Sequence, residues 1–199
     1  MILFFDTETT GFMDEFKPLG HESHGRIVQI AFIVTDNDGK EMASYNSLIN
    51  TPVEIGGKAL EVHGKTKAMC ELYGVEPITA LSIFHGYAKR CDKVIGHNVY
   101  FDRQMVMNEM AIAGRDWKWL DDMLYDCTVA MMQDVCELPL TAAQVAKNMT
   151  GFEQPKLQEA YKYCFGIEFD GAHDALADVR ACKDVYFWAL NERMRNGNS

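Results

Sequence analysis

The sequence predicts an α/β domain in which a mixed β-sheet is flanked by helices. Three strand-like runs follow one another at the start of the chain, and helical patterns alternate with short apolar strands after residue 78. Consecutive strands joined by short turns pair antiparallel, whereas strands separated by helices usually pair parallel. We therefore expect both kinds of pairing in one sheet, with functional residues gathered where strands end.

The first half of the sheet is predicted as an antiparallel meander. The run I-L-F-F-D at 2–6 is the first strand, and I-V-Q-I-A-F-I-V-T-D at 27–36 is the second. The D-N-D-G stretch at 36–39 is a turn signal that leads into a third strand at 41–49.

The remaining elements alternate between helix and strand. Apolar residues at helical spacing predict a helix over 78–91, and K-V-I-G-H at 93–97 predicts a strand before a second helix at 100–113. Later elements are expected as a strand at 122–127 and helices at 128–134, 140–149, 156–164 and 174–194. We expect one domain over 1–195, followed by a frayed tail at 196–199.

The composition narrows the class of protein. A length of 199 residues with 48% apolar content is enough for one buried core. The net charge of −10 argues against a long electrostatic grip on duplex DNA, although it permits short local contacts with nucleic acid. Six widely spaced cysteines without a C-x-x-C pair indicate reduced thiols, and no run resembles a signal peptide or a membrane span, so we expect a cytoplasmic protein.

Acidic residues stand where predicted strands end or helices begin. Asp6 and Glu8 alternate along the first strand, which places both carboxylates on one face, about 7 Å apart or closer. Asp102 lies near the first turn of a helix for which Asn98 is a plausible N-cap. In the stretch G-A-H-D-A-L-A-D-V, His173 and Asp178 flank the start of the last helix, with Asp174 as its N-cap.

Each of these positions also has a purely structural interpretation, as a helix cap, a solvated strand end or a surface histidine. Together they suggest chemistry, because carboxylates gathered at one sheet edge repel each other unless cations bind. Mg²⁺ and Mn²⁺ prefer oxygen ligands, and two such ions can hold a phosphodiester for in-line attack. A nearby histidine can accept the proton of the attacking water. The pattern therefore favours metal-assisted phosphodiester hydrolysis.

Three stretches resemble the exonuclease motifs of the DEDDh branch of the DEDD 3′–5′ exonucleases: F-D-T-E-T-T-G, H-N-V-Y-F-D and H-D-A-L-A-D. The resemblance extends from residue 2 to about residue 190 and is greatest to the epsilon-type proofreading exonucleases of DNA polymerase III, with ribonuclease T and oligoribonuclease as relatives. It implies a ribonuclease H-like fold and two divalent cations, Mg²⁺ or Mn²⁺. It also implies that His173 is the general base and that four carboxylates hold the metals: Asp6, Glu8, Asp102 and Asp178.

The resemblance also implies substrate contacts. The stretch A-L-E-V-H-G-K-T at 59–66 is similar to a family segment that contacts the terminal nucleotide, through His63 and Gly64 here, although Lys65 stands where isoleucine is usual. Family members place the residues matching Thr9 and Thr10 near the terminal sugar through backbone groups. The residues matching Asn98 and Phe101 lie against the scissile end.

The loop from Phe12 to Gly25 departs from the family, whose members often pass almost directly from the first motif to the second strand. It carries His21 and His24, which we interpret as solvated rather than metal-binding. The alternative is that the loop forms a lip over the active site, where it would influence the choice of substrate.

The resemblance implies a metal-dependent 3′–5′ exonuclease that releases nucleoside 5′-monophosphates from single-stranded or frayed 3′ ends, with DNA favoured over RNA. Two alternatives stay open: an enzyme that trims RNA or degrades oligoribonucleotides, and a non-catalytic subunit that binds a polymerase. Proofreading subunits often attach to a polymerase through a C-terminal extension. The chain ends soon after the last helix, so we expect a free-standing enzyme, with a DNA polymerase as a possible partner and the oligomeric state open.

Overall fold

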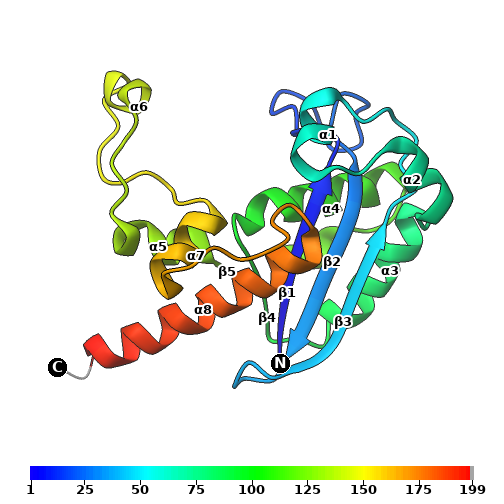
Figure 1. The fold of residues 1–199 in the computed structure, drawn as a ribbon. Coiled ribbons are helices and arrows are strands. Elements are labelled where there is room, and N and C mark those ends of the chain that lie inside the picture. The colour runs from blue at the N-terminus through cyan, green and yellow to red at the C-terminus, as the bar shows by residue number, and fades with distance from the viewer. Residues whose placement is uncertain (198–199) are drawn as a thin grey trace.

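The computed structural model describes residues 1–197, which contain a five-stranded sheet with the order β3-β2-β1-β4-β5 (Figure 1). Strands β1 (Ile2–Thr9), β2 (Ile27–Thr35) and β3 (Glu41–Leu48) pair antiparallel. Strands β4 (Lys93–Gly96) and β5 (Tyr125–Cys127) continue the sheet in parallel with β1. The predicted mixed sheet and its antiparallel meander are confirmed.

Helices cover both faces of the sheet (Figure 1). Leu3 and Phe5 of β1 enter one core with residues of α3 (Pro77–Ala88) and α4 (Val99–Ile112). Ile2 and Phe4 enter a second core with residues of α8 (Ala175–Gly197). Because side chains alternate along a strand, Asp6 and Glu8 continue the face that α8 covers.

Strand β1 extends beyond its parallel neighbour. Its paired residues with β4 end at Phe4, opposite Ile95. The backbone N–H of Thr7 instead donates to Asp102 Oδ1 at 2.9 Å. The C-terminal half of β1 is therefore open to the start of α4, which is how Asp102 reaches the same sheet edge as Asp6 and Glu8.

The α5–α7 region departs from the prediction. Helices α5 (Thr128–Cys136) and α7 (Leu157–Phe165) contribute to the core under α8, while α6 (Ala142–Ala146) lies at the tip of an arm that points away from the sheet (Figure 1). The helix predicted over 140–149 is therefore only partly correct. The helix cannot extend to that limit because Asn148 adopts a left-handed conformation, with φ of 57°.

Two short helices beside the sheet were not predicted from the sequence. Helix α1 (Gly57–His63) ends at Gly64, whose φ of 69° and N–H bond to the Leu60 carbonyl, at 2.8 Å, form a left-handed cap. Helix α2 (Lys67–Tyr73) follows after a short turn, and a 3₁₀ turn η1 (Lys118–Leu120) lies before β5. The α1–α2 turn holds His63, Gly64 and Lys65.

The loop Phe12–Gly25 closes on itself at its base. The Gly25 N–H donates to the Phe12 carbonyl at 2.9 Å, and a Cβ at Gly25 would lie 2.2 Å from the Gly11 carbonyl oxygen, so only glycine fits there. His24 is buried inside the loop, where its Nδ1 accepts from the Asp14 N–H and its Nε2 donates to the Pro18 carbonyl. The interpretation of His24 as solvated is wrong, because the ring cross-links its own loop.

Helix α8 continues to Gly197, whereas residues 198–199 of the predicted frayed tail lie outside the described residues. Across residues 1–197, no helix combines the length and the apolar character that crossing a membrane requires.

Candidate active site

Four carboxylates from three elements meet at the open end of β1. Asp6 and Glu8 lie on β1, Asp102 lies in the first turn of α4, and Asp178 lies in the first turn of α8. Burial raises the pKa of Asp6 well above its usual value, and the charges of the other three carboxylates raise it further. The structure therefore brings together the acidic residues predicted from the sequence.

Asp102 is the most deeply buried of the four, with 3% of its surface exposed. Its Oδ1 accepts from the Thr7 N–H at 2.9 Å and from Thr7 Oγ1 at 2.7 Å. Burial nevertheless raises its pKa to about 7, against the effect of these hydrogen bonds. Asn98 is the N-cap of α4 and Asp102 lies in the first turn, as predicted, although Asn98 has a φ of 67° and its side chain makes no capping hydrogen bond.

Glu8, Asp178 and His173 form a tighter group within this cluster. One potential ligand atom from each residue lies within 4.8 Å of the other two. Burial raises the pKa of Glu8 to about 7 and that of Asp178 to about 6, although the His173 N–H donates to Asp178 at 3.1 Å. A group of buried carboxylates that resists full ionisation near pH 7 lacks compensating positive charge.

The donor set fits hard divalent cations. Carboxylate oxygens are the ligands that Mg²⁺ and Mn²⁺ prefer, and a 2+ ion supplies the charge that the chain itself does not. Within the chain, the charge of Lys65 acts to lower the pKa of three of the four carboxylates: Asp6, Glu8 and Asp178. The position and the chemistry of the four carboxylates therefore both suit metal ligands: Asp6, Glu8, Asp102 and Asp178.

His173 lies at the exposed surface of this group, directly before α8. Its φ is 68°, a left-handed conformation that is uncommon outside glycine. Asp174 follows as the predicted cap of α8, because its Oδ1 accepts from the Leu176 N–H at 3.2 Å. The cap fixes where the helix begins and hence where His173 stands relative to Asp178.

A cleft of about 440 Å³ opens beside the carboxylates. Four of the predicted substrate-contact residues line it: Thr9, Thr10, His63 and Phe101. Asn98 and Gly64 are not among the lining residues. Phe12, which no sequence motif singled out, also lines the cleft; the residue is 83% exposed, and its ring lies edge-on to Phe101 at 6.0 Å between centroids. Its position directly after the first motif was the only available signal.

His63 lines this cleft and is itself largely buried. Burial, followed by the charge of Lys65, lowers its pKa, so the ring is neutral. Its Nδ1 accepts from the Lys65 N–H at 3.0 Å, which leaves the proton on Nε2. Nε2 is buried near the Thr9 backbone but closes no hydrogen bond of ordinary geometry within residues 1–197.

The Thr9–Thr10 part of the cleft wall is held by backbone and hydroxyl contacts. Thr9 Oγ1 donates to the Gly11 carbonyl at 2.9 Å. The Thr10 hydroxyl accepts from the Arg26 N–H, and the Thr10 N–H donates to the Arg26 carbonyl, both at 2.9 Å. Arg26 in turn forms a two-bond ion pair with Glu109, at 2.8 and 2.7 Å. The Thr10 N–H is thus already bonded within the chain, and the contact of Thr9 and Thr10 backbone groups with a terminal sugar stays a prediction.

Known proteins share this fold. E. coli exonuclease I bound to a dT13 oligonucleotide matches with a TM-score of 0.76 and 22% identity, covering 99% of this chain and 42% of that one. A zinc-bound complex of E. coli exonuclease I with single-stranded DNA matches with a TM-score of 0.74 and 21% identity, over 98% of this chain and 41% of that one. The chain thus spans about two fifths of exonuclease I.

No curated protein is similar enough in sequence to count as a match. The family described as exonuclease, of the ribonuclease T type, matches residues 3–186. That range includes all three motifs and the four carboxylates at the end of β1. The chain therefore belongs to this exonuclease family, and its fold is the ribonuclease H-like fold that the DEDDh resemblance implied.

Proposed function

We propose that the protein is a metal-dependent 3′–5′ exonuclease that releases nucleoside 5′-monophosphates from single-stranded or frayed 3′ ends, with DNA favoured. The observation that supports this most strongly is the grouping of Glu8, Asp178 and His173 within 4.8 Å, beside Asp6 and Asp102 and an open cleft. Membership of the exonuclease family supports the same reaction.

In this proposal Asp6, Glu8, Asp102 and Asp178 hold two divalent cations, Mg²⁺ or Mn²⁺. When bound, such cations stabilise the charge of a phosphodiester under attack and lower the pKa of a bound water. His173 accepts the proton of the attacking water, since its ring is exposed next to the Glu8 and Asp178 carboxylates. Because the His173 ring is exposed, the proton that it takes up can then pass to solvent without crossing the core.

The cleft supports a single strand as substrate. Phe12 and Phe101 offer ring surfaces on which bases can stack, and His63 lines the same cleft where we place the terminal nucleotide. Thr9 lines the cleft with them, and Gly64 and Asn98, which do not line it, stay predicted contacts. An acidic protein that holds a few nucleotides by stacking does not need a basic face. Solved complexes of exonuclease I with dT13 and dA16 make DNA the first substrate to test.

The test is a panel of 5′-labelled oligomers: single-stranded DNA, a mismatched primer–template and RNA, each with Mg²⁺ and with EDTA. We expect a ladder that shortens from the 3′ end, nucleoside 5′-monophosphate as product, and complete inhibition by EDTA. Asp6→Ala should abolish turnover, whereas Asp134→Ala, at an exposed position on α5, should not. Activity in EDTA or in Asp6→Ala would contradict the metal assignment.

The same panel separates the alternatives. Faster cleavage of the RNA oligomer would indicate an enzyme that trims RNA or degrades oligoribonucleotides. A protein that binds a DNA polymerase yet releases no nucleotide with Mn²⁺ would be a non-catalytic subunit. A polymerase partner and a cytoplasmic location stay predictions.

A further inference from the structure

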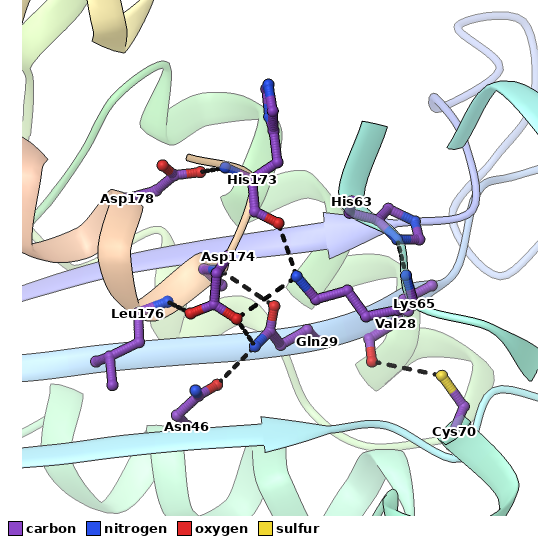
Figure 2. Close-up of polar contacts among 11 residues, drawn as sticks. Val28, Gln29, Asn46, His63, Lys65, Cys70, His173, Asp174, Leu176 and Asp178 are labelled. Carbon is purple, nitrogen blue, oxygen red and sulfur yellow. Dashed lines mark hydrogen bonds and ion pairs between the residues drawn. The ribbon is translucent and has the colours of Figure 1, made fainter. Parts of the chain in front are cut away.

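Lys65 is a buried lysine whose ammonium group contacts the loop that carries His173. Only 7% of the residue is exposed. Its Nζ donates to the His173 backbone carbonyl at 2.7 Å and lies 3.5 Å from Asp174 Oδ2, as Figure 2 shows. A lysine is costly to bury unless its charge is paired and its N–H groups are bonded. The contact joins two segments 108 residues apart in the sequence.

The backbone of His173 is held from both sides. Its N–H donates to Asp178 at 3.1 Å, and its carbonyl accepts from Lys65 (Figure 2). A non-glycine residue in the left-handed region, here with φ of 68°, persists when surrounding contacts determine it. Because the His173 side chain is exposed, these backbone contacts are what orient the ring.

A second layer ties the same network to the sheet. Gln29 on β2 donates through Nε2 to Asp174 Oδ2 and to Asn46 Oδ1, both at 2.9 Å, and accepts from the Ala175 N–H at 3.1 Å (Figure 2). Asp174 Oδ2 is therefore shared by Gln29 and Lys65. Although burial acts to raise it, the Gln29 hydrogen bond and the Lys65 charge hold the pKa of Asp174 below its usual value, so the carboxylate stays ionised as their acceptor.

Lys65 also contacts His63, which lines the cleft. Its backbone N–H donates to His63 Nδ1 at 3.0 Å, so one residue is bonded to both histidines of the site (Figure 2). We infer that Lys65 is a positioning residue that clamps the His173 loop to the α1–α2 turn and so fixes the proton acceptor relative to His63. The inference rests on the proposed role of His173 as general base.

The clamp must be distinguished from a simple effect of charge. Lys65 lies among the carboxylates, so its removal strengthens the attraction of the site for cations. Removal of Lys65 should therefore improve metal binding, so weaker metal binding cannot explain a loss of activity in the variant. Measuring turnover at saturating Mg²⁺, with the Mg²⁺ midpoint determined for each variant, separates the two effects.

The experiment compares Lys65→Met with Lys67→Met. Lys67 is a matched control, because its Nζ likewise donates to a backbone carbonyl, that of Thr51 at 2.6 Å, outside the carboxylate cluster. For Lys65→Met we expect kcat to fall about 10- to 100-fold with KM changed less than about threefold, as for a displaced catalytic group. Lys67→Met should stay within about twofold, and Lys65→Arg, which keeps the charge and the donors, should recover part of the loss.

Hydrogen–deuterium exchange of the peptide around residues 171–175, in the full chain without substrate, gives a readout that does not need activity. Faster exchange there in Lys65→Met, and not in Lys67→Met, is the expected result. If Lys65→Met fails to fold, Lys65→Gln, one bond shorter and uncharged, is measured in the same way.

Unchanged kcat and unchanged exchange in the Lys65 variant would overturn the clamp. So would equal losses in the Lys65 and Lys67 variants. A wild-type protein without nuclease activity would instead contradict the proposed function, while the exchange comparison would still test the clamp.

Discussion

Two clusters of buried charge lie close to β1 and β2, and they differ in whether the chain satisfies them. Arg26 and Glu109 form a closed pair, with two hydrogen bonds between their side chains and a third from the Ile27 N–H to Glu109. The carboxylates of Asp6, Glu8 and Asp178, with Asp102 beside them, share one lysine and have raised pKa values. The charges of the first cluster are neutralised within the protein, whereas the negative charges of the second cluster are only partly neutralised.

The comparison shows how buried charge separates structure from function. A complete pair stabilises the end of a strand, so its loss should appear as unfolding. In the carboxylate cluster, like charges repel each other until a cation binds. Substitution of one carboxylate should therefore abolish activity without lowering stability. The predictions below test this difference.

The largest expected effect is on activity. Asp178→Asn keeps the shape of the side chain and an acceptor for the His173 N–H but removes a charge proposed to hold metal. We expect kcat to fall by on the order of 10³-fold, since a metal ion supplies several kcal/mol of transition-state stabilisation. The metal-free Tm at pH 8 should rise, because one repulsive charge is gone.

Asp184→Asn, further along α8, is the control and should change neither quantity. A clear decrease of the metal-free Tm in Asp178→Asn would mean that the carboxylate stabilises the fold, and the contrast between the two clusters would be lost.

The closed pair should behave in the opposite way. Glu109→Gln leaves Arg26 without its ionic partner, which should lower the free energy of unfolding by about 3–5 kcal/mol. Urea denaturation with and without Mg²⁺ measures this, and Mg²⁺ should not restore the loss. Glu22→Gln, in the exposed part of the loop, serves as control. Restoration by Mg²⁺ would place Glu109 in the metal site.

The pH dependence of stability gives a smaller effect. The pKa of Glu8 is raised from 4.5 to about 7, and those of Asp102 and Asp178 from 3.8 to about 7 and about 6. The folded state therefore keeps protons that the unfolded state releases, so stability is lost as pH rises from about 4 to about 7. The metal-free Tm should fall by about 5 °C or more between pH 5 and pH 8.

Mg²⁺ should raise the Tm strongly at pH 8 and little at pH 5, where the carboxyls hold protons. Asp178→Asn should show a shallower decrease than the wild type. A metal-free Tm that increases over this pH range would contradict the raised pKa values.

The smallest effect is expected at the loop. Phe12 and Phe16 are both exposed, at 83% and 93%. Of these two residues, Phe12 lines the cleft and Phe16 does not. Phe12→Ala should raise KM about fivefold to tenfold through lost base stacking, with little change in kcat or Tm. Phe16→Ala should leave all three unchanged. Equal effects of the two substitutions on KM would argue against stacking on Phe12.

Much of the site could be predicted from local patterns. Alternation along the first strand placed Asp6 and Glu8 on one face, and the carboxylates Asp102 and Asp178 were placed at helix starts by capping signals. These signals are local, because strand and helix periodicity fix which side of an element a residue occupies. The mixed sheet followed from the order of the elements.

Other features depend on contacts that no local pattern carries. Helices α1 and α2 have seven residues each, too few for a clear apolar period, and most of their residues are exposed. The arm around α6 has helix-forming residues but no core to pack against. The Lys65 side chain is buried because its ammonium group bonds to the His173 carbonyl, 108 residues away in the sequence. His24 is buried because its ring bonds to the backbone of its own loop.

The Phe12–Gly25 loop can be replaced by other loops because its two ends are held together at its base. The chain leaves β1 and returns to β2 at neighbouring points, joined by the Thr10 and Gly25 backbone hydrogen bonds, so loops of other lengths can be grafted there at little entropic cost. One interior residue limits such grafts. Asn108 on α4 is fully buried and accepts from the Gly20 N–H at 2.8 Å, so a new loop must supply that donor, or Asn108 must be replaced by an apolar residue.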